Sequence, residues 1–305
     1  MLRRFRTLAT ALTLVTALPL AAAAAPPGFA FLEIPAGARI SALGGAGGSF
    51  ATGVEGMFWN PAALESSKGV QVAASHFQMY ENLKHDDFAV GGHLWGGGLA
   101  ASVRALYTGT IDERDDLGNL IGGFGAHDLE FGVGYGWSAR PGLALGASAR
   151  LVRERIADRA AQTYALGAGA TWEPAKVAGL RVAVSGHNLG PAAHYTFDGV
   201  KGAPVGLPAA LQAGASMGWP VGHLALRAGA EARMTRGRTG VGIAAAELGG
   251  LSGASLRGGL RVNDSATNVS LGLGYTLTKL DLDYAWVPSR LDLEDTHRIS
   301  FRAQF

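Results

Sequence analysis

Alternation of apolar and polar residues runs through most of the chain and constrains its fold more than any other feature. The pattern is clearest at 296–305. There Ile299, Phe301, Ala303 and Phe305 are apolar, and Arg298, Ser300, Arg302 and Gln304 lie between them. Successive side chains of a β-strand point to opposite faces, so such a segment has one apolar and one polar face. Apolar spacing typical of helices is scarce. The sequence therefore predicts an all-β protein.

Fourteen segments follow this pattern. They are 68–77, 86–95, 98–107, 128–138, 142–153, 162–172, 179–187, 208–217, 222–233, 238–246, 254–262, 267–276, 279–287 and 296–305. Most are close to the roughly 9–11 residues that a tilted strand needs to cross a bilayer.

The connections between these segments alternate in length along most of the chain. Long ones fall at 108–127, 188–207 and 288–295, and short turns such as Gly96-Gly97 lie between them. Transmembrane barrels alternate in this way, with short periplasmic turns and longer outer loops. An even number of strands places both ends of the barrel on the periplasmic side.

A soluble β-sandwich also alternates, but three features favour a membrane barrel. The polar face is rich in Gly, Ser, Arg and Asp, as suits a lumen. Aromatic residues at strand ends resemble interfacial girdles; they are Tyr107, Trp137, Trp172, Tyr275 and Trp286. Phe301 and the terminal Phe305 resemble an outer-membrane assembly signal. We therefore predict a transmembrane antiparallel β-barrel in an outer membrane of the Gram-negative type, with a secreted soluble β-protein as the alternative.

Composition excludes several other classes of protein. The chain has 305 residues, of which 16% are charged, yet no internal apolar run reaches the roughly 18 residues of a membrane helix. Cysteine is absent, which excludes disulfides, thiolate metal sites and cysteine nucleophiles. The net charge is +2, but three of the 26 basic residues lie in the first six positions, leaving 23 against 24 acidic residues. This balance gives no reason to expect a nucleic-acid partner.

The first 25 residues are predicted to be a secretory signal peptide. Arg3, Arg4 and Arg6 precede a short apolar stretch, and small residues at 21–25 offer cleavage after Ala24 or Ala25. An uncleaved anchor is the alternative. Residues 26–67 do not alternate cleanly, and we expect them to fold inside the lumen as a plug or hatch ahead of a barrel at 68–305. Glycine permits close backbone approach, and Asn60 can cap a short helix that begins at Pro61.

Several motifs of the chain resemble the PorV/PorQ family of outer-membrane proteins and the related FadL transporters of hydrophobic compounds. These motifs are Gly37-Ala38-Arg39, Leu43-Gly44-Gly45-Ala46, Trp59-Asn60-Pro61-Ala62, Asn188-Leu189-Gly190-Pro191 and Asp283-Tyr284-Ala285 with the ending Thr296 to Phe305. The resemblance implies a fourteen-stranded barrel with an N-terminal hatch. It makes Gly44, Gly45, Asn60, Pro61 and Ala62 candidates for gating.

The resemblance implies two different functions. Similarity to the FadL transporters implies that a hydrophobic ligand is bound or passed through the hatch. Similarity to PorV implies a role in type IX secretion, in which the barrel docks the C-terminal domain of secreted protein cargo. A closed structural barrel is a third hypothesis. The expected partners are outer-membrane lipid, the barrel assembly machinery, and either a hydrophobic small molecule or a secreted protein.

Charged residues in the polar register of neighbouring strands are candidates for one network inside the lumen. They are Arg257, Arg261, Asp281, Asp283, Arg298 and Arg302. A ladder of paired charges that shapes the barrel is the favoured interpretation, because barrel interiors are commonly filled by side chains. A charged passage that selects solutes is the alternative.

No motif of the chain indicates an enzyme. Gly214-Ala215-Ser216-Met217-Gly218 matches G-x-S-x-G, but Trp219-Pro220 follows where a nucleophile elbow needs a helix. The Gly44–Gly48 run lacks the ending of a phosphate-binding loop. Histidines are scattered and form no metal-binding spacing. We therefore predict a protein without catalytic residues, metal or cofactor.

Overall fold

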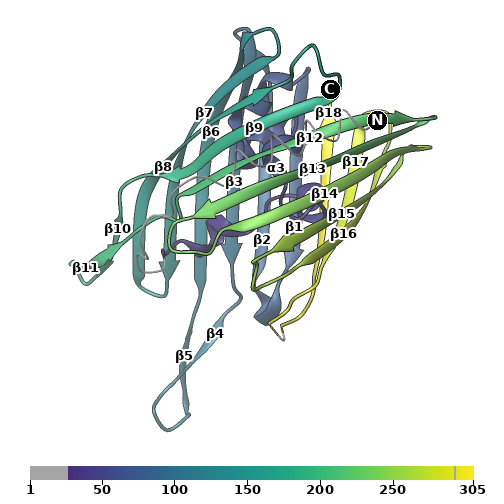
Figure 1. Cartoon of the computed structure of the whole chain (residues 1–305). Coiled ribbons are helices and arrows are strands. Elements are labelled where there is room, and N and C mark those ends of the chain that lie inside the picture. The colour runs from purple at the N-terminus through teal and green to yellow at the C-terminus, as the bar shows by residue number, and fades with distance from the viewer. Residues whose placement is uncertain (1–26, 292) are drawn as a thin grey trace.

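The computed structural model describes residues 27–291 and 293–305, so the predicted signal peptide lies outside the described residues. Within these ranges, fourteen antiparallel strands close into a barrel, and each pairs with its neighbours in the ring (Figure 1). The barrel strands are β1 (Val70–Gln78), β2 (Lys84–Leu94), β3 (Gly97–Tyr107), β6 (Ala126–Arg140), β7 (Leu143–Ile156), β8 (Arg159–Trp172), β9 (Leu180–Leu189), β12 (Ala210–Val221), β13 (Leu224–Thr235), β14 (Val241–Leu251), β15 (Ala254–Val262), β16 (Val269–Thr276), β17 (Leu280–Val287) and β18 (Thr296–Gln304). The predicted number of strands and their closure are confirmed.

Closure depends on the pairing of the first barrel strand with the last. Strand β1 pairs with β18 from Gln71 opposite Gln304 to Gln78 opposite His297. This pairing leaves neither strand with an open edge, and a sheet in lipid must close because each unpaired backbone group there costs several kcal/mol.

The two ends of the barrel differ. At one end, which we call the turn end, short turns such as Trp95-Gly96 and Ser252-Gly253 join the strands. The other end, which we call the loop end, carries the long connections. Two of these contain strands that the period-two pattern did not predict: the hairpin of β4 (Ile111–Arg114) and β5 (Leu120–Phe124), and that of β10 (Ala193–Phe197) and β11 (Val200–Val205). The β4–β5 hairpin projects well beyond the barrel (Figure 1).

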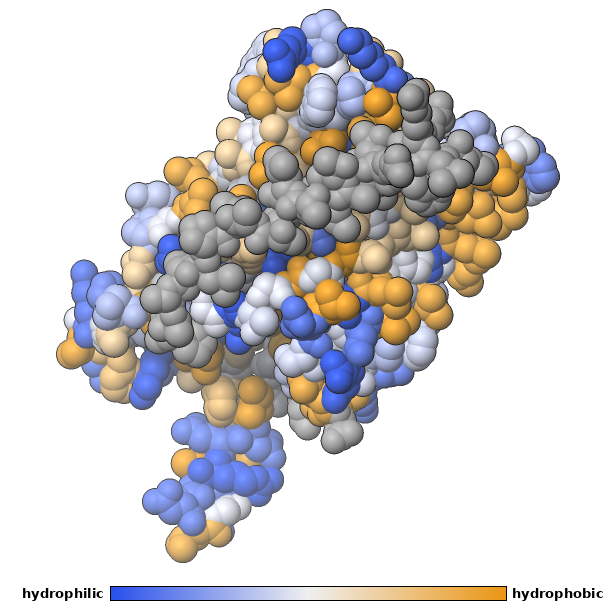
Figure 2. All heavy atoms as spheres, viewed as in Figure 1, coloured by the Kyte–Doolittle hydropathy of each residue, from blue (hydrophilic) through white to orange (hydrophobic). Residues whose placement is uncertain are grey.

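The outer face of the barrel is apolar in the register that the sequence predicts. Phe131 and Val133 of β6 and Leu271 and Leu273 of β16 are about half exposed, whereas Glu130 faces inward and is fully buried. Figure 2 shows hydrophobic side chains over the flanks of the barrel and mostly hydrophilic ones on the projecting hairpin. Such an exterior suits a lipid environment. Among the described residues, no helix is both long enough and apolar enough to span a bilayer.

The buried apolar core of the molecule lies inside the barrel, between the wall and the segment Ala30–Ser66. This segment, which we call the plug, consists of short helices: η2 (Ala30–Glu33), α2 (Ala38–Ala42), α3 (Gly47–Phe50), η3 (Gly53–Glu55), α4 (Gly56–Trp59) and η4 (Pro61–Ser66). One core cluster joins Ile40, Leu43, Phe50 and Trp59 of the plug to Ile243 of β14. The plug therefore gives the lumen most of its hydrophobic filling.

The motif Asn188-Leu189-Gly190-Pro191 marks an irregularity in the wall. The register of β8 against β9 shifts between Leu166 and Ala168, and Asn188 has a left-handed φ of 56°. A Cβ at Gly190 would overlap the carbonyl of Tyr164. The chain here leaves the regular ladder for the long connection that carries β10 and β11. A short 3-10 helix, η5 (Tyr80–Asn82), lies in the connection between β1 and β2.

Candidate functional site: the plug, its seat and the vestibule

Inward-facing glycines of the wall form the seat of helix η4. A Cβ at Gly98 of β3 would overlap Leu64, one at Gly146 of β7 would overlap Pro61 and Ala62, and one at Gly169 of β8 would overlap Asn60. Because these wall positions carry no side chain, the plug backbone can lie directly on the sheet. This close packing explains why the inward register is so rich in glycine.

Asn60 connects η4 to the rest of the plug and to the wall. Its Oδ1 accepts a hydrogen bond from the Ala62 N–H at 3.1 Å, as expected of a helix cap. Its amide nitrogen donates to the Gly48 carbonyl at 3.3 Å and to the Ala170 carbonyl of β8 at 3.3 Å. The side chain is fully buried. Pro61 occupies the first position of η4, where its missing N–H costs nothing.

Gly44 and Gly45 make a second seat on the opposite side of the plug. Both have left-handed backbone conformations, with φ of 67° and 84°. A Cβ at Gly259 of β15 would overlap the Gly44 backbone, so the two chains touch. Arg261 Nε donates to the Gly44 carbonyl at 2.7 Å, and Arg233 donates to the Gly45 carbonyl at 3.0 Å. The predicted gating glycines are therefore held by arginines of the wall.

Wall arginines supply donors to plug carbonyls around most of the barrel. Short helices leave many carbonyls without an internal partner, and burial makes an unpaired carbonyl costly. The donors and acceptors are Arg104 to Ile34, Arg150 to Met57, Arg181 to Ala51, Arg227 to Ser49, Arg233 to Gly45, Arg261 to Gly44 and Arg298 to Pro35. The inward arginines therefore position the plug, in addition to pairing with acids.

One ion-pair network joins the plug to β14–β18. Glu247 of β14 accepts from Arg39 of the plug at 3.0 Å and from Arg257 at 2.6 Å. Arg257 also pairs with Asp283 at 2.6 Å. Glu55 of the plug lies 3.1 Å from Arg39 and 3.4 Å from Arg302. Arg302 pairs in turn with Asp281 at 2.6 Å.

The structure brings four of the six predicted network residues into this cluster: Arg257, Asp281, Asp283 and Arg302. Arg261 instead pairs with Asp264 at 3.0 Å, and Arg298 contacts Ser41 and lies over the Phe77 ring at 4.1 Å. Sequence reasoning missed Arg39, Glu55 and Glu247. Burial lowers the pKa of the Arg39 guanidinium, but the carboxylates of Glu247 and Glu55 more than offset this effect, so its pKa is raised.

Two carboxylates of the wall, Glu231 and Asp87, accept hydrogen bonds from backbone N–H groups of the plug. Glu231 of β13 accepts from the Ser49 N–H and Oγ, both at 2.7 Å, and from the Gly48 N–H at 3.1 Å. Asp87 of β2 accepts from the Gly37 N–H at 3.2 Å and from Arg104 at 2.9 Å. Ser216, the serine of the G-x-S-x-G match, is buried and contacts Arg227 and the Ser49 carbonyl. Its surroundings are those of a plug contact.

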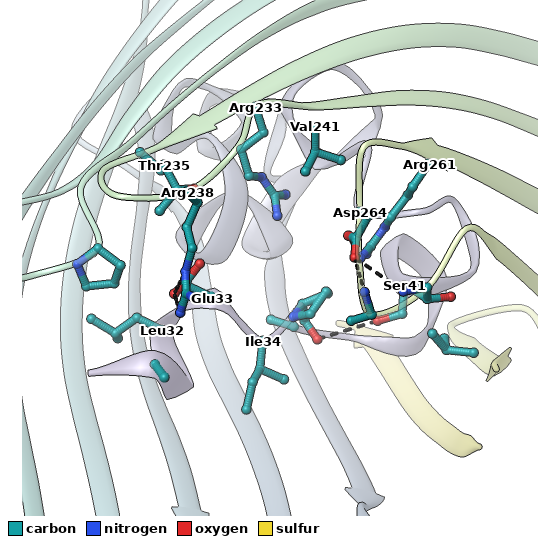
Figure 3. A pocket seen from close by; sticks show the side chains of 18 of the residues that line it. Leu32, Glu33, Ile34, Ser41, Arg233, Thr235, Arg238, Val241, Arg261 and Asp264 are labelled. Carbon is teal, nitrogen blue, oxygen red and sulfur yellow. Dashed lines mark hydrogen bonds and ion pairs between the residues drawn. The ribbon is translucent and has the colours of Figure 1, made fainter. Parts of the chain in front are cut away.

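A cavity of about 770 Å³ lies between the plug and the connections of the loop end. We call it the vestibule. Its plug side is mostly apolar, with Leu32, Ile34, Phe58 and Trp59, and Arg233 of the wall lies over the Trp59 ring at 5.2 Å. Figure 3 shows Arg233 pointing into this space, and the pairs Arg238–Glu33 and Arg261–Asp264 at its border.

An apolar cluster adjoins the vestibule beneath the irregular part of the wall. Phe29 and Phe31 are almost fully buried among Val152 of β7, Ala165 of β8 and Leu207. Leu32 belongs to the same cluster and also lines the vestibule. Apolar surface therefore continues from the cavity to the inside of the wall at β7 and β8. Within the described residues, no three His, Cys, Asp or Glu side chains are placed to share a metal ion.

Comparison with solved structures shows that the chain shares its barrel fold with FadL-like channels of the outer membrane. The CymD monoaromatic hydrocarbon channel superposes with a TM-score of 0.62 at 15% identity, over 88% of this chain and 97% of that chain. The Pseudomonas putida toluene transporter TodX gives 0.60 at 13% identity, over 88% and 98%. A Pseudomonas aeruginosa FadL homologue gives 0.52 at 11% identity, over 88% and 98%.

Sequence comparison assigns no family. No family model matches the chain, and no curated protein matches it. The structural likeness agrees with the FadL side of the resemblance seen in the sequence. The PorV/PorQ side of that resemblance stays a prediction.

Proposed function

We propose that the protein is an outer-membrane channel that takes up hydrophobic compounds at its loop end and that the plug gates their passage. The observation that carries this proposal is a closed barrel whose lumen is filled by a separate segment bordering a cavity of about 770 Å³. The plug surface facing that cavity is mostly apolar, and it continues into the cluster of Phe29 and Phe31.

Beside the apolar clusters, the plug makes many polar contacts with the wall, and these suit a gate. Hydrogen bonds to wall arginines and glutamates can exchange with water when the plug shifts. The likeness to structures titled as hydrocarbon channels and a toluene transporter agrees with this reading.

The proposal is tested by uptake across an intact outer membrane, because small hydrophobic compounds cross simple phospholipid bilayers unaided. Cells that express the protein should take up 1-N-phenylnaphthylamine, a fluorescent probe excluded by lipopolysaccharide, faster than cells with an empty vector. Replacing Asn60 and Pro61 by alanine should abolish this uptake or produce a leak visible as conductance in planar bilayers. The matched control is Asn119→Ala in the β4–β5 hairpin. Unchanged uptake and conductance in the double variant would refute gating by this element.

Docking of a protein at the loop end is a second candidate function. The β4–β5 hairpin favours it, because Leu117, Leu120 and Ile121 are 86%, 60% and 61% exposed on a projecting element. Exposed apolar groups of this kind mark interaction sites. Type IX cargo is the partner that the PorV resemblance implies. Deleting residues 110–124 should abolish co-purification of a secreted protein if docking is the function, and should leave probe uptake unchanged.

A further inference from the structure

An aromatic groove lies on the outer face of the wall at the turn end. It has a volume of about 490 Å³ and is lined by Trp95, Gly96, Tyr135, Trp137 and Ser138. The first two residues form the turn between β2 and β3, and the other three belong to β6, which pairs with β3. The exposed apolar side chains of Leu94 and Val133 adjoin it along the same strands. The groove therefore lies where the apolar band of the barrel ends.

Trp95 occupies a backbone position that disfavours its side chain. Its φ is 54° and that of Gly96 is 80°, so both residues of this two-residue turn are left-handed. Such turns favour Asn, Asp or Gly at both positions, and a bulky residue there is an outlier. The indole is nevertheless 79% exposed, so it gains little from packing in compensation.

The contacts around Trp95 fix the geometry of the groove. The Tyr135 hydroxyl donates to the Trp95 carbonyl at 2.8 Å, so it is already engaged. A Cβ at Gly97 would lie 2.7 Å from the Tyr135 ring, and the absence of one leaves room for that ring. The rings of Tyr135 and Trp137 lie 6.1 Å apart at an angle of 17°. Ring surfaces are therefore what the groove offers to a ligand.

We propose that this groove binds the ammonium headgroup of a phospholipid in the inner leaflet of the outer membrane. Aromatic faces carry negative potential and attract ammonium groups, tryptophan most strongly. None of the lining residues is charged, so no competing salt bridge or repelling cation is built into the site. The turn end of a transmembrane barrel faces the periplasm, where the surrounding lipids are phospholipids. Phosphatidylethanolamine is the headgroup of this chemistry.

Lipid selectivity measured on the folded full-length protein tests the proposal. The protein in dodecyl maltoside is titrated with dioleoyl phosphatidylethanolamine or dioleoyl phosphatidylglycerol, which share their acyl chains, and bound lipid is counted by native mass spectrometry. We expect about 5-fold tighter binding of the ammonium lipid, within the range known for cation–π contacts. Equal binding of the two lipids, or a preference for the glycerol lipid, would overturn the proposal.

Variants distinguish lipid binding in the groove from the general affinity of aromatic side chains for the membrane–water interface. Trp137→Leu keeps an apolar side chain but loses the ring, and it should remove the selectivity; Trp137→Phe should retain most of it. The matched control is Trp172→Leu, which alters a 48% exposed tryptophan at the same end but outside the groove.

Trp95→Gly removes the indole without disturbing the fold, because glycine readily adopts the left-handed backbone of this turn. Heat-modifiable migration on gels should stay normal while selectivity is lost. Selectivity that survives in Trp95→Gly, or that falls equally in Trp172→Leu, would show that the groove is not the site. The uptake experiment is independent of this result.

Discussion

Single residues of the wall decide how closely the plug can approach it. Gly98, Gly146 and Gly169 are examples where the absence of a side chain creates the contact. Sequence alone showed that the inward register is rich in glycine, but it could not show why. The reason appears only when the plug is in place, because the partner segment at Asn60 to Leu64 lies far from these glycines in the sequence.

Gly146→Val should weaken the seat of the plug. The added side chain would overlap the backbone at Pro61 and Ala62, and overpacking of this kind costs roughly 1–3 kcal/mol of unfolding free energy. Urea titration of the folded protein in detergent, followed by tryptophan fluorescence, measures the change. The control is Gly109→Val, since nothing lies within 4 Å of a Cβ there. Equal stabilities of the two variants would contradict the proposed seat.

Glu247 is the residue on which the charge network depends. It joins Arg39 and Arg257, and Glu247→Gln would leave two partly buried guanidinium groups short of a charged partner. Loss of one partner of a buried pair costs roughly 3–5 kcal/mol, and the lower end applies here because the side chain is 18% exposed. The same urea titration measures it. Glu113→Gln, on the exposed β4 strand, should change stability by less than about 0.5 kcal/mol.

The sequence predicted only part of this network, because one member lies beyond a predicted strand end and two lie in the plug. The alternating pattern placed Arg257, Asp281, Asp283 and Arg302 in the inward register, which suffices to bring them together. Glu247 was missed because the predicted strand ended at 246, whereas β14 continues to Leu251 through glycines that interrupt the apolar alternation. Arg39 and Glu55 belong to short helices without a period, so the sequence could not give their direction.

At the scale of elements, regular strands are predictable and additions to loops are not. Alternation located all fourteen barrel strands because each has one face toward lipid and one toward the lumen. The β4–β5 hairpin and β11 have water on most sides, and no burial pattern distinguishes their faces. Strand β10 is too short for its one buried residue, Ala193, to give a period. The β8–β9 register shift also escaped the sequence, because it depends on how Gly190 passes Tyr164.

Removing the β4–β5 hairpin should leave the barrel intact. The two strands form a separate sheet and pair only with each other. Replacing residues 110–124 by a Gly-Ser linker should therefore preserve the heat-dependent shift on gels and leave the denaturation midpoint within experimental error. Loss of the folded band would show that the hairpin contributes to assembly, and the hairpin could then no longer be treated as an independent surface element.

At the scale of the whole molecule, the plug and the wall satisfy each other's buried polar groups and share one apolar core. The wall supplies arginine side chains that donate hydrogen bonds and glycines against which the plug backbone packs. The plug supplies the carbonyls that accept these hydrogen bonds and most of the apolar core. A barrel without its plug would leave the buried Arg104 and Arg150 and the partly buried Arg233 without their plug partners, so deletion of the plug is an ambiguous test of gating. Restraining the plug in the intact protein is the sharper test.

A reversible cross-link distinguishes a moving plug from a fixed one. The Ala38 N–H donates to Ser300 Oγ at 3.1 Å, which brings α2 against β18, and the chain contains no cysteine of its own. Ala38→Cys with Ser300→Cys should therefore form a single disulfide under oxidation. If uptake requires displacement of the plug, probe uptake should fall to the level of the empty vector and recover on reduction. Ser75→Cys with Ser300→Cys is the control, because this pair lies opposite within the wall and leaves the plug free. Uptake that continues in the cross-linked plug variant would mean that the compound passes beside a stationary plug, and the gate would then have to lie in the wall.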